Sequence, residues 1–312
     1  MAMLRSSILF AVAIACLALV SSCARLPSTG VTSLKPATMS ELRGYLLSHK
    51  ADLDQFRLRG PFAVAVQKDY EIRLSANERI VADLYLSAPA EKAPLVIFLH
   101  GNDSSKEDHA YQAMHLATWG MHSLALQLPN KGLWVGNGRT LAGIVNFIYR
   151  RPGIIDSRID VNKIILVGHS FSGSSVAIAL AENAPAVGSI LLDPAGVGKD
   201  LPKFLRQVNK PVMLLGADEQ FSSTRNRGYF YRYIRSGIAE VSIRDAIHED
   251  GQYPAELPLQ IFGSTTEELQ ITFVSALTSA AFSLAYTGKF DYAWTSFGDA
   301  FDNGKLVNAK KK

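Results

Sequence analysis

Short, continuous apolar blocks alternate with longer segments of helical periodicity over most of the chain after residue 95. The block at residues 95–99 has no polar position, as in a central parallel strand that is covered on both faces. Similar blocks predict strands at residues 121–128, 163–167, 189–192, 212–215 and 241–243. Strands that alternate with helices imply right-handed crossovers between parallel strands. The pattern therefore predicts an α/β fold with a doubly wound, mostly parallel sheet.

Helical periodicity and strict alternation predict the remaining elements. Helices are expected at residues 39–58, 106–119, 139–149, 174–181 and 267–286, and an antiparallel pair of strands at residues 62–67 and 80–86. The last helix is long and apolar enough to resemble a membrane span. Its Thr and Ser residues, and its position after the strands, favour packing on the sheet. We expect a single domain at residues 39–312, with no large cap.

The first 22 residues have the pattern of a secretory signal peptide. A positively charged start at residues 1–5 precedes an apolar run at residues 8–20, and the small residues Ser21 and Ser22 follow. This is the order of a signal peptide, and the run is shorter than a transmembrane helix needs. We therefore expect the protein to be exported.

Cys23 follows this signal directly. Residues 20–23 (Val-Ser-Ser-Cys) resemble the lipobox of bacterial lipoproteins, in which the cysteine is acylated and becomes the new N-terminus. Residues 23–38 are rich in Ser, Thr, Pro and Gly, as in a flexible tether. The pattern predicts a lipid-anchored protein of the bacterial cell envelope, facing the periplasm or in the outer membrane. Plain secretion with an incidental Cys23 is the alternative.

Charge and motif content favour a small-molecule partner. The formal net charge is only +4, and no basic stripe interleaved with aromatic residues is visible in the sequence, so a nucleic-acid partner is not indicated. The sequence has no H-E-x-x-H motif, no cysteine cluster and no Gly-rich phosphate loop that opens a helix. We therefore expect neither a metal nor a cofactor.

A candidate nucleophile lies where the predicted strand at residues 163–167 meets the helix at residues 174–181. Residues 168–172 (Gly-His-Ser-Phe-Ser) have the form G-x-S-x-G, except that Ser172 replaces the last glycine. The glycines of such a turn let the backbone pass tightly, and the serine projects above the sheet in a strained conformation. Ser170 is therefore the predicted nucleophile. A strand-to-helix turn without chemistry is the alternative.

From residue 62 to residue 286 the chain resembles the α/β-hydrolase superfamily, through this serine turn and through residues 99–102 (Leu-His-Gly-Asn) after an early parallel strand. The resemblance implies that the backbone N–H groups of Asn102 and Phe171 bind the oxyanion. It also implies the chain order of nucleophile, acid and histidine. His248 is the only histidine beyond His169, so His248 is the predicted base.

Two aspartates satisfy this order for the acid. Asp193 follows the predicted strand at residues 189–192, and Asp218 follows the next strand, where most of the superfamily keeps its acid. Residues 192–194 (Leu-Asp-Pro) resemble chlorophyllase-like hydrolases and pancreatic-type lipases, whose acid follows the earlier strand. We therefore favour Asp193 and keep Asp218 as the alternative, although either aspartate could simply cap the next helix.

These residues predict a serine hydrolase of carboxylic esters that forms an acyl-enzyme on Ser170, with a small-molecule ester as substrate and the membrane as a partner through the lipid anchor. A non-catalytic binding lipoprotein with the same fold is the alternative. The short stretch at residues 196–210 leaves no room for an inserted cap and predicts an open cleft. For the Arg- and Tyr-rich residues 221–233, a solvated helix face is favoured over an anionic or glycosidic substrate site.

Overall fold

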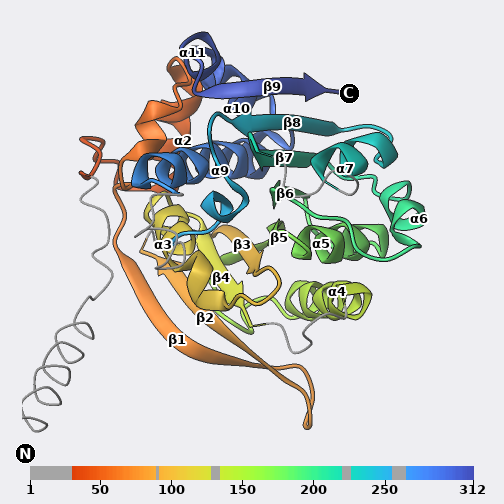
Figure 1. Ribbon diagram of the computed structural model, residues 1–312. Coiled ribbons are helices and arrows are strands. Elements are labelled where there is room, and N and C mark those ends of the chain that lie inside the picture. Colours follow the sequence, from red (N-terminus) through yellow and green to blue (C-terminus); the bar gives the residue numbers. More distant parts are fainter. Residues whose placement is uncertain (1–29, 89–90, 128–133, 220–225, 255–264) are drawn as a thin grey trace, which may run out of the picture.

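The computed structural model describes residues 30–88, 91–127, 134–219, 226–254 and 265–312, which form a nine-stranded sheet with helices on both faces (Figure 1). The strand order is β1-β2-β4-β3-β5-β6-β7-β8-β9. The strands that run parallel are β3 (Ala93–Leu99), β4 (His122–Leu126), β5 (Ile159–His169), β6 (Gly188–Leu192), β7 (Val212–Ala217) and β8 (Ile238–Ile243). The strands antiparallel to their neighbours are β1 (Val64–Arg73), β2 (Arg79–Ser87) and β9 (Leu306–Lys311). The predicted α/β fold with a mostly parallel sheet is confirmed.

The central strands send side chains alternately to two hydrophobic cores, one on each face of the sheet. Val96 and Phe98 of β3 belong to the first core. Leu95, Ile97 and Leu99 belong to the second. Because both faces of such a strand are buried, neither set of alternate positions is polar, which explains the continuous apolar blocks of the sequence. Each fully buried aliphatic side chain contributes about 1.5–3 kcal/mol to the stability of the folded protein.

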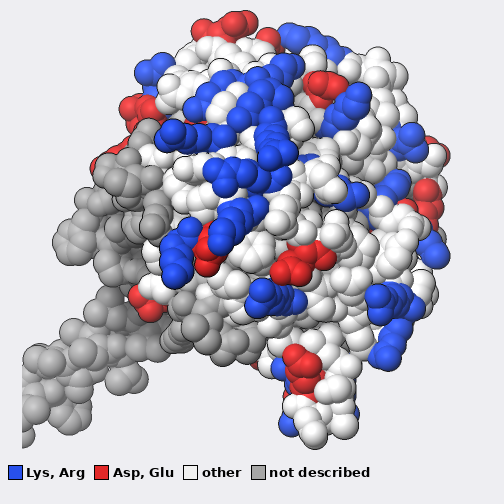
Figure 2. Space-filling model, turned by 90° about the vertical axis from the view of Figure 1, so that its right-hand side faces the viewer, with Lys and Arg blue, Asp and Glu red and all other residues white. Residues whose placement is uncertain are grey.

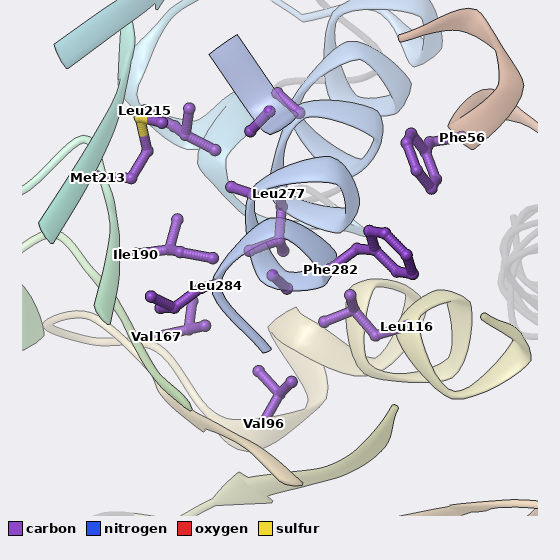
Figure 3. Close-up of a cluster of buried hydrophobic side chains, with 14 of the residues drawn as sticks. Phe56, Val96, Leu116, Val167, Ile190, Met213, Leu215, Leu277, Phe282 and Leu284 are labelled. Atoms are coloured by element: carbon purple, nitrogen blue, oxygen red, sulfur yellow. The ribbon is translucent and has the colours of Figure 1, made fainter. Parts of the chain in front are cut away.

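The helices divide between these two cores. Covering the first core are α2 (Met39–Ser48), α3 (Ala110–Thr118), α9 (Glu267–Thr287), α10 (Asp291–Ser296) and α11 (Gly298–Asp302). Covering the second are α4 (Trp134–Arg150), α5 (Ser172–Ala181), α6 (Leu201–Leu205) and α7 (Arg227–Tyr233). Figure 3 shows the first core, where Leu284 of α9 lies beside Val167 of β5 and Ile190 of β6. With helices on both faces of the sheet, the residues that follow the parallel strands lie together at one edge of the sheet.

Helix α9 packs on the sheet, as its sequence predicts. Within the described residues it is the one helix that is long and apolar enough to cross a membrane, and most of it is buried inside the protein. Among its buried hydroxyl groups, those of Ser275 and Thr278 donate hydrogen bonds within the helix, to the carbonyl oxygens of Ile271 and Val274. Such back-bonding lets hydroxyl groups occupy an apolar interface without an unpaired donor. The length and composition of α9 are therefore explained by its central position in the core.

Two predicted elements differ from the structure. The helix expected at residues 39–58 ends at Ser48, where His49 becomes extended, and a separate 3-10 turn follows at Asp54–Arg57. The strand expected to be the last, at residues 241–243, is β8, and β9 follows it at the edge of the sheet. β9 escaped notice because it is short and rich in lysine, as edge strands often are.

The start of the described chain is attached to the domain. Residues 1–29, which include the predicted signal peptide and Cys23, lie outside the described residues. The amide of Thr32 donates to the carbonyl of Arg59, and the amide of Arg59 donates to the carbonyl of Gly30. Thr38 caps α2 by accepting a hydrogen bond from the amide of Glu41. The second half of the segment expected as a tether therefore contacts the fold through its backbone.

The edge formed by β9 and α7 presents a basic face that the sequence order hides. Figure 2 shows lysine and arginine side chains gathered on this side of the molecule. The ammonium groups of Lys310 and Lys312 each lie 4.7 Å from the ring centre of Tyr231. The guanidinium of Arg206 lies 4.9 Å from the ring centre of Tyr233. The sequence shows no basic stripe interleaved with aromatic residues. In the structure, the pairing of β9 with β8 brings lysine side chains beside an aromatic side chain of α7.

Candidate active site

Ser170 occupies the tight turn between β5 and α5 at the carboxyl end of the sheet. Its φ angle is 54°, in the left-handed region that non-glycine residues rarely occupy, and such strain is a feature of functional turns. The turn is held by two backbone hydrogen bonds, from the Ser170 amide to the Leu192 carbonyl at 3.1 Å and from the Ala195 amide to the Ser170 carbonyl at 2.9 Å. These bonds attach Ser170 to both sides of the turn that carries Asp193.

The close packing of this turn explains where glycine is required and where it is not. A Cβ atom on Gly168 would lie 2.7 Å from the Ser172 carbonyl oxygen, and one on Gly173 would lie 2.5 Å from the Cβ of Pro194. Ser172, at the position where the motif usually has glycine, is fully buried, and its hydroxyl donates to the carbonyl of His100. The departure from the motif therefore adds a hydrogen bond between the serine turn and the His-Gly segment.

His248 and Asp193, which are 55 residues apart in the sequence, form a buried pair. The Nδ1 of His248 lies 2.6 Å from the Oδ2 of Asp193. Asp193 follows β6 with a φ angle of 36°, which turns its side chain toward the loop after β8. A carboxylate in this position fixes the tautomer of the imidazole, with the proton on Nδ1 and the lone pair on Nε2.

Asp218, the alternative acid, lies elsewhere. It is partly exposed after β7, and its Oδ1 accepts a hydrogen bond from the side-chain amide of Asn308 in β9 at 3.3 Å. The structure thus brings together Ser170, Asp193 and His248 of the predicted set, and it places Asp218 against the edge strand.

The His-Gly segment lies against the nucleophile, as a contributor to an oxyanion hole must. A Cβ atom on Gly101 would come within 3.1 Å of the Cβ of Ser170, so only a glycine lets the two segments approach without displacement. Asn102 follows directly, and Phe171 precedes the first residue of α5. The N–H groups at a helix N-terminus carry partial positive charge that favours a developing anion.

Three other histidines, located just before α3, within α3 and at the start of β4, are buried. Burial lowers the pKa of His109, His115 and His122 to about 4. Burial, together with the neighbouring His248, also lowers the pKa of His169 well below its usual value. The Nε2 of His169 lies 3.0 Å from the carbonyl oxygen of His248, so a neutral His169 can donate there and hold the base in place.

Arg227 is the site residue that sequence reasoning missed. Its Nη1 donates to the Oδ1 of Asp193 at 2.7 Å, and its side chain is only 4% exposed. The segment that contains Arg227 was interpreted as a solvated basic face, and this residue contradicts that interpretation because it points inward. The sequence feature that comes closest to indicating this contact is Gly216. A Cβ atom there would lie 2.0 Å from the Cδ of Arg227, so a glycine is needed to leave space for the arginine.

The turn that carries His248 contains a buried carboxyl group. Asp250 accepts hydrogen bonds from the amide of Ile247, at 2.9 Å, and from the hydroxyl of Thr265. Burial, with the nearby charge of Glu249, raises the pKa of Asp250 to about 6. The folded protein therefore holds the carboxyl proton of Asp250 more tightly than the unfolded chain does, in which the pKa of this group is 3.8. The stability that this group contributes is fully present below pH 3.8 and is lost as the pH rises through about 6.

We expect Asp250→Asn to stabilise the protein only at neutral and alkaline pH. The amide keeps an acceptor for Ile247 and carries no charge, so the free energy of unfolding should exceed that of the wild type by about 1–2 kcal/mol at pH 8 and by little at pH 4. Urea unfolding across this range measures the difference. Asp245→Asn, at an exposed position of the same loop, should show no such pH dependence. If the free energy of unfolding of Asp250→Asn differed from that of the wild type by the same amount at every pH, the raised pKa of Asp250 would be contradicted.

Within the part of the chain that the structure describes, no group of three or more His, Cys, Asp or Glu side chains could hold a metal ion.

The amino-acid sequence also matches a known protein family. Residues 96–292, more than half of the chain, match the model of the alpha/beta hydrolase family. The protein therefore belongs to the alpha/beta hydrolase family. No curated protein matches the chain. Membership of this family indicates hydrolase activity.

Proposed function

We propose that the protein is a serine hydrolase of carboxylic esters with Ser170 as nucleophile, His248 as base and Asp193 as acid. The observation that supports this most strongly is the buried hydrogen bond between His248 and Asp193, beside a serine held in a left-handed turn. A serine hydroxyl is a weak nucleophile until an imidazole takes its proton and a carboxylate orients that imidazole. All three groups lie at the carboxyl edge of the parallel strands.

The proposed reaction has two halves. The Oγ of Ser170 attacks the ester carbonyl and forms the C–O bond of the tetrahedral intermediate, while its proton passes to Nε2 of His248. The N–H groups of Asn102 and Phe171 stabilise the oxyanion. His248 then protonates the alcohol oxygen as its bond to the carbonyl carbon breaks, and the acyl group remains on Ser170. Water, deprotonated by His248, attacks the acyl carbon. The bond between this carbon and Oγ then breaks, Oγ takes the proton back from His248, and the carboxylic acid leaves.

Turnover of p-nitrophenyl acetate tests this function against the alternative of a non-catalytic binding protein. The purified mature protein should release p-nitrophenol with saturation kinetics, and a burst of one equivalent should precede the steady state if deacylation is the slower half. Acyl chains of increasing length then define the preferred ester. A protein that releases no p-nitrophenol above the buffer rate would support the binding alternative.

We also propose that the protein is exported and anchored through Cys23. The charged start, the apolar run and the small residues before Cys23 support this. A lipid-anchored enzyme would meet esters at or near the membrane surface.

Cells that express the protein should incorporate a fatty-acid analogue into it, and Cys23→Ser should abolish the incorporation. Cys16→Ser, within the apolar run, is the matched control and should leave the label unchanged. Label that persists in Cys23→Ser would contradict the anchor.

A further inference from the structure

A buried arginine contacts the side of Asp193 opposite His248. The Oδ1 of Asp193 accepts hydrogen bonds from Nη1 of Arg227, at 2.7 Å, and from the backbone amide of Ala217, at 3.1 Å. The Oδ2 of the same carboxylate contacts Nδ1 of His248, at 2.6 Å. The two oxygens thus have separate partners, and the carboxylate cannot rotate without breaking bonds on both sides.

Arg227 is itself held by β8 and has room because of a glycine. Its Nη2 donates to the hydroxyl of Ser242 at 2.9 Å, and its Nε lies 3.4 Å from Oε1 of Glu240. Gly216 on β7 leaves the space through which the arginine side chain passes. A planar guanidinium with several donors suits such a site, because it can bind three acceptors in fixed directions.

Charges of alternating sign extend from the catalytic pair to the surface. The Oε2 of Glu240 lies 3.1 Å from the Nζ of Lys310, which is half exposed on the basic face of β9. Glu240 and Arg227 have side chains that are only 4–5% exposed. Removing one partner of a buried ion pair is strongly destabilising, because the other charge is left uncompensated. Glu240 therefore secures Arg227, and Arg227 secures Asp193.

We propose that Arg227 is a positioning residue for the catalytic acid, an inference that rests on the proposed function. By occupying Oδ1 it leaves Oδ2 as the acceptor for His248, which keeps the Nδ1–H tautomer and the direction of Nε2. Its positive charge also opposes the positive charge that His248 acquires during the reaction.

The test compares variants that remove or keep the guanidinium on Asp193. Arg227→Met with Glu240→Gln removes both charges of the pair and keeps similar volumes, whereas Glu240→Gln alone leaves Arg227 on Asp193. Arg227→Lys keeps the charge but offers a single ammonium, which cannot replace the fork. Thermal unfolding and circular dichroism establish that each variant is folded.

Turnover of p-nitrophenyl acetate gives the first readout. The double variant should lose about 10- to 100-fold in kcat with little change in KM, because the lost orientation acts on the reacting groups. Glu240→Gln alone should lose less in kcat than the double variant, because Arg227 still donates to Oδ1 of Asp193. Arg227→Lys should lose about 5- to 10-fold in kcat, since its ammonium keeps the charge but not the fork.

The tautomer of the His248 imidazole, read from the ring-nitrogen NMR signals of histidine-labelled protein and assigned with His248→Asn, needs no substrate. In Glu240→Gln the neutral ring should carry its proton on Nδ1, whereas in the double variant the two tautomers should mix, because the carboxylate of Asp193 has lost its guanidinium partner at Oδ1 and can turn. An unchanged tautomer, or an unchanged kcat, would overturn the role of Arg227 even if the wild type is an active esterase. If the double variant does not fold, Arg227→Lys decides: equal kcat to the wild type would overturn the proposal. A wild type without turnover overturns the esterase function alone, and the tautomer still tests Arg227.

Discussion

Ser170→Ala should abolish covalent labelling by a fluorophosphonate probe and lower kcat for p-nitrophenyl esters by about 10⁴- to 10⁶-fold. The probe phosphonylates a serine only when a base has made its oxygen nucleophilic, so labelling reports the whole arrangement of Ser170, His248 and Asp193. The alanine removes the attacking oxygen and leaves the fold, because the hydrogen bonds of the turn come from the backbone of Ser170. In-gel fluorescence and the ester assay measure the two effects.

Ser175→Ala is the matched control. Ser175 lies on α5 just beyond the turn, is fully buried, and donates its hydroxyl to the carbonyl of Trp134. Its loss should cost about 1 kcal/mol of stability and leave labelling intact. Labelling that survives in Ser170→Ala would place the nucleophile elsewhere, and a folded wild type that takes no label would contradict the catalytic proposal.

Asp193→Asn should lower kcat by about 10³- to 10⁴-fold while the protein stays folded. The amide of Ala217 and the guanidinium of Arg227 both donate to the Oδ1 position. The introduced amide therefore keeps its oxygen there and turns its NH₂ group toward His248. This NH₂ group forces Nδ1 to act as an acceptor, so the ring proton moves to Nε2. A protonated Nε2 cannot receive the proton of Ser170. Steady-state kinetics at several pH values measure the loss.

Asp218→Asn provides the comparison for the acid. Its carboxylate accepts a hydrogen bond from the side-chain amide of Asn308, whereas the carboxylate that lies against His248 is that of Asp193, so kcat should stay within about threefold of the wild type. Should Asp218→Asn lose several orders of magnitude while Asp193→Asn stays active, the assignment of the acid would have to be reversed.

Much of the site follows from local patterns in the sequence. The apolar block before Ser170, the small residues after it and the His-Gly segment upstream indicate the serine turn even though Ser172 departs from the motif. The structure explains the departure, since the hydroxyl of Ser172 donates to His100. The base was predicted by its chain order, because His248 is the only histidine late in the chain.

The choice between Asp193 and Asp218 depends on long-range geometry. Both aspartates follow a short buried strand and precede a polar loop, so their local patterns are nearly alike. The difference is which carboxylate the loop after β8 reaches, and that depends on the order of β6, β7 and β8 in the sheet. Pairing between strands that are distant in the sequence carries no local signature.

By itself the sequence determined the fold class, the serine turn and the late histidine, because these depend on periodicity and on residues that are neighbours in the chain. Only the tertiary structure decided that Asp193 meets His248, that Arg227 turns inward onto Asp193, and that β9 brings Lys310 beside Tyr231 of α7. The physical reason is that a buried charge is tolerated only where its partners converge. That convergence is a property of the packed sheet, in which Gly216 gives the arginine its space.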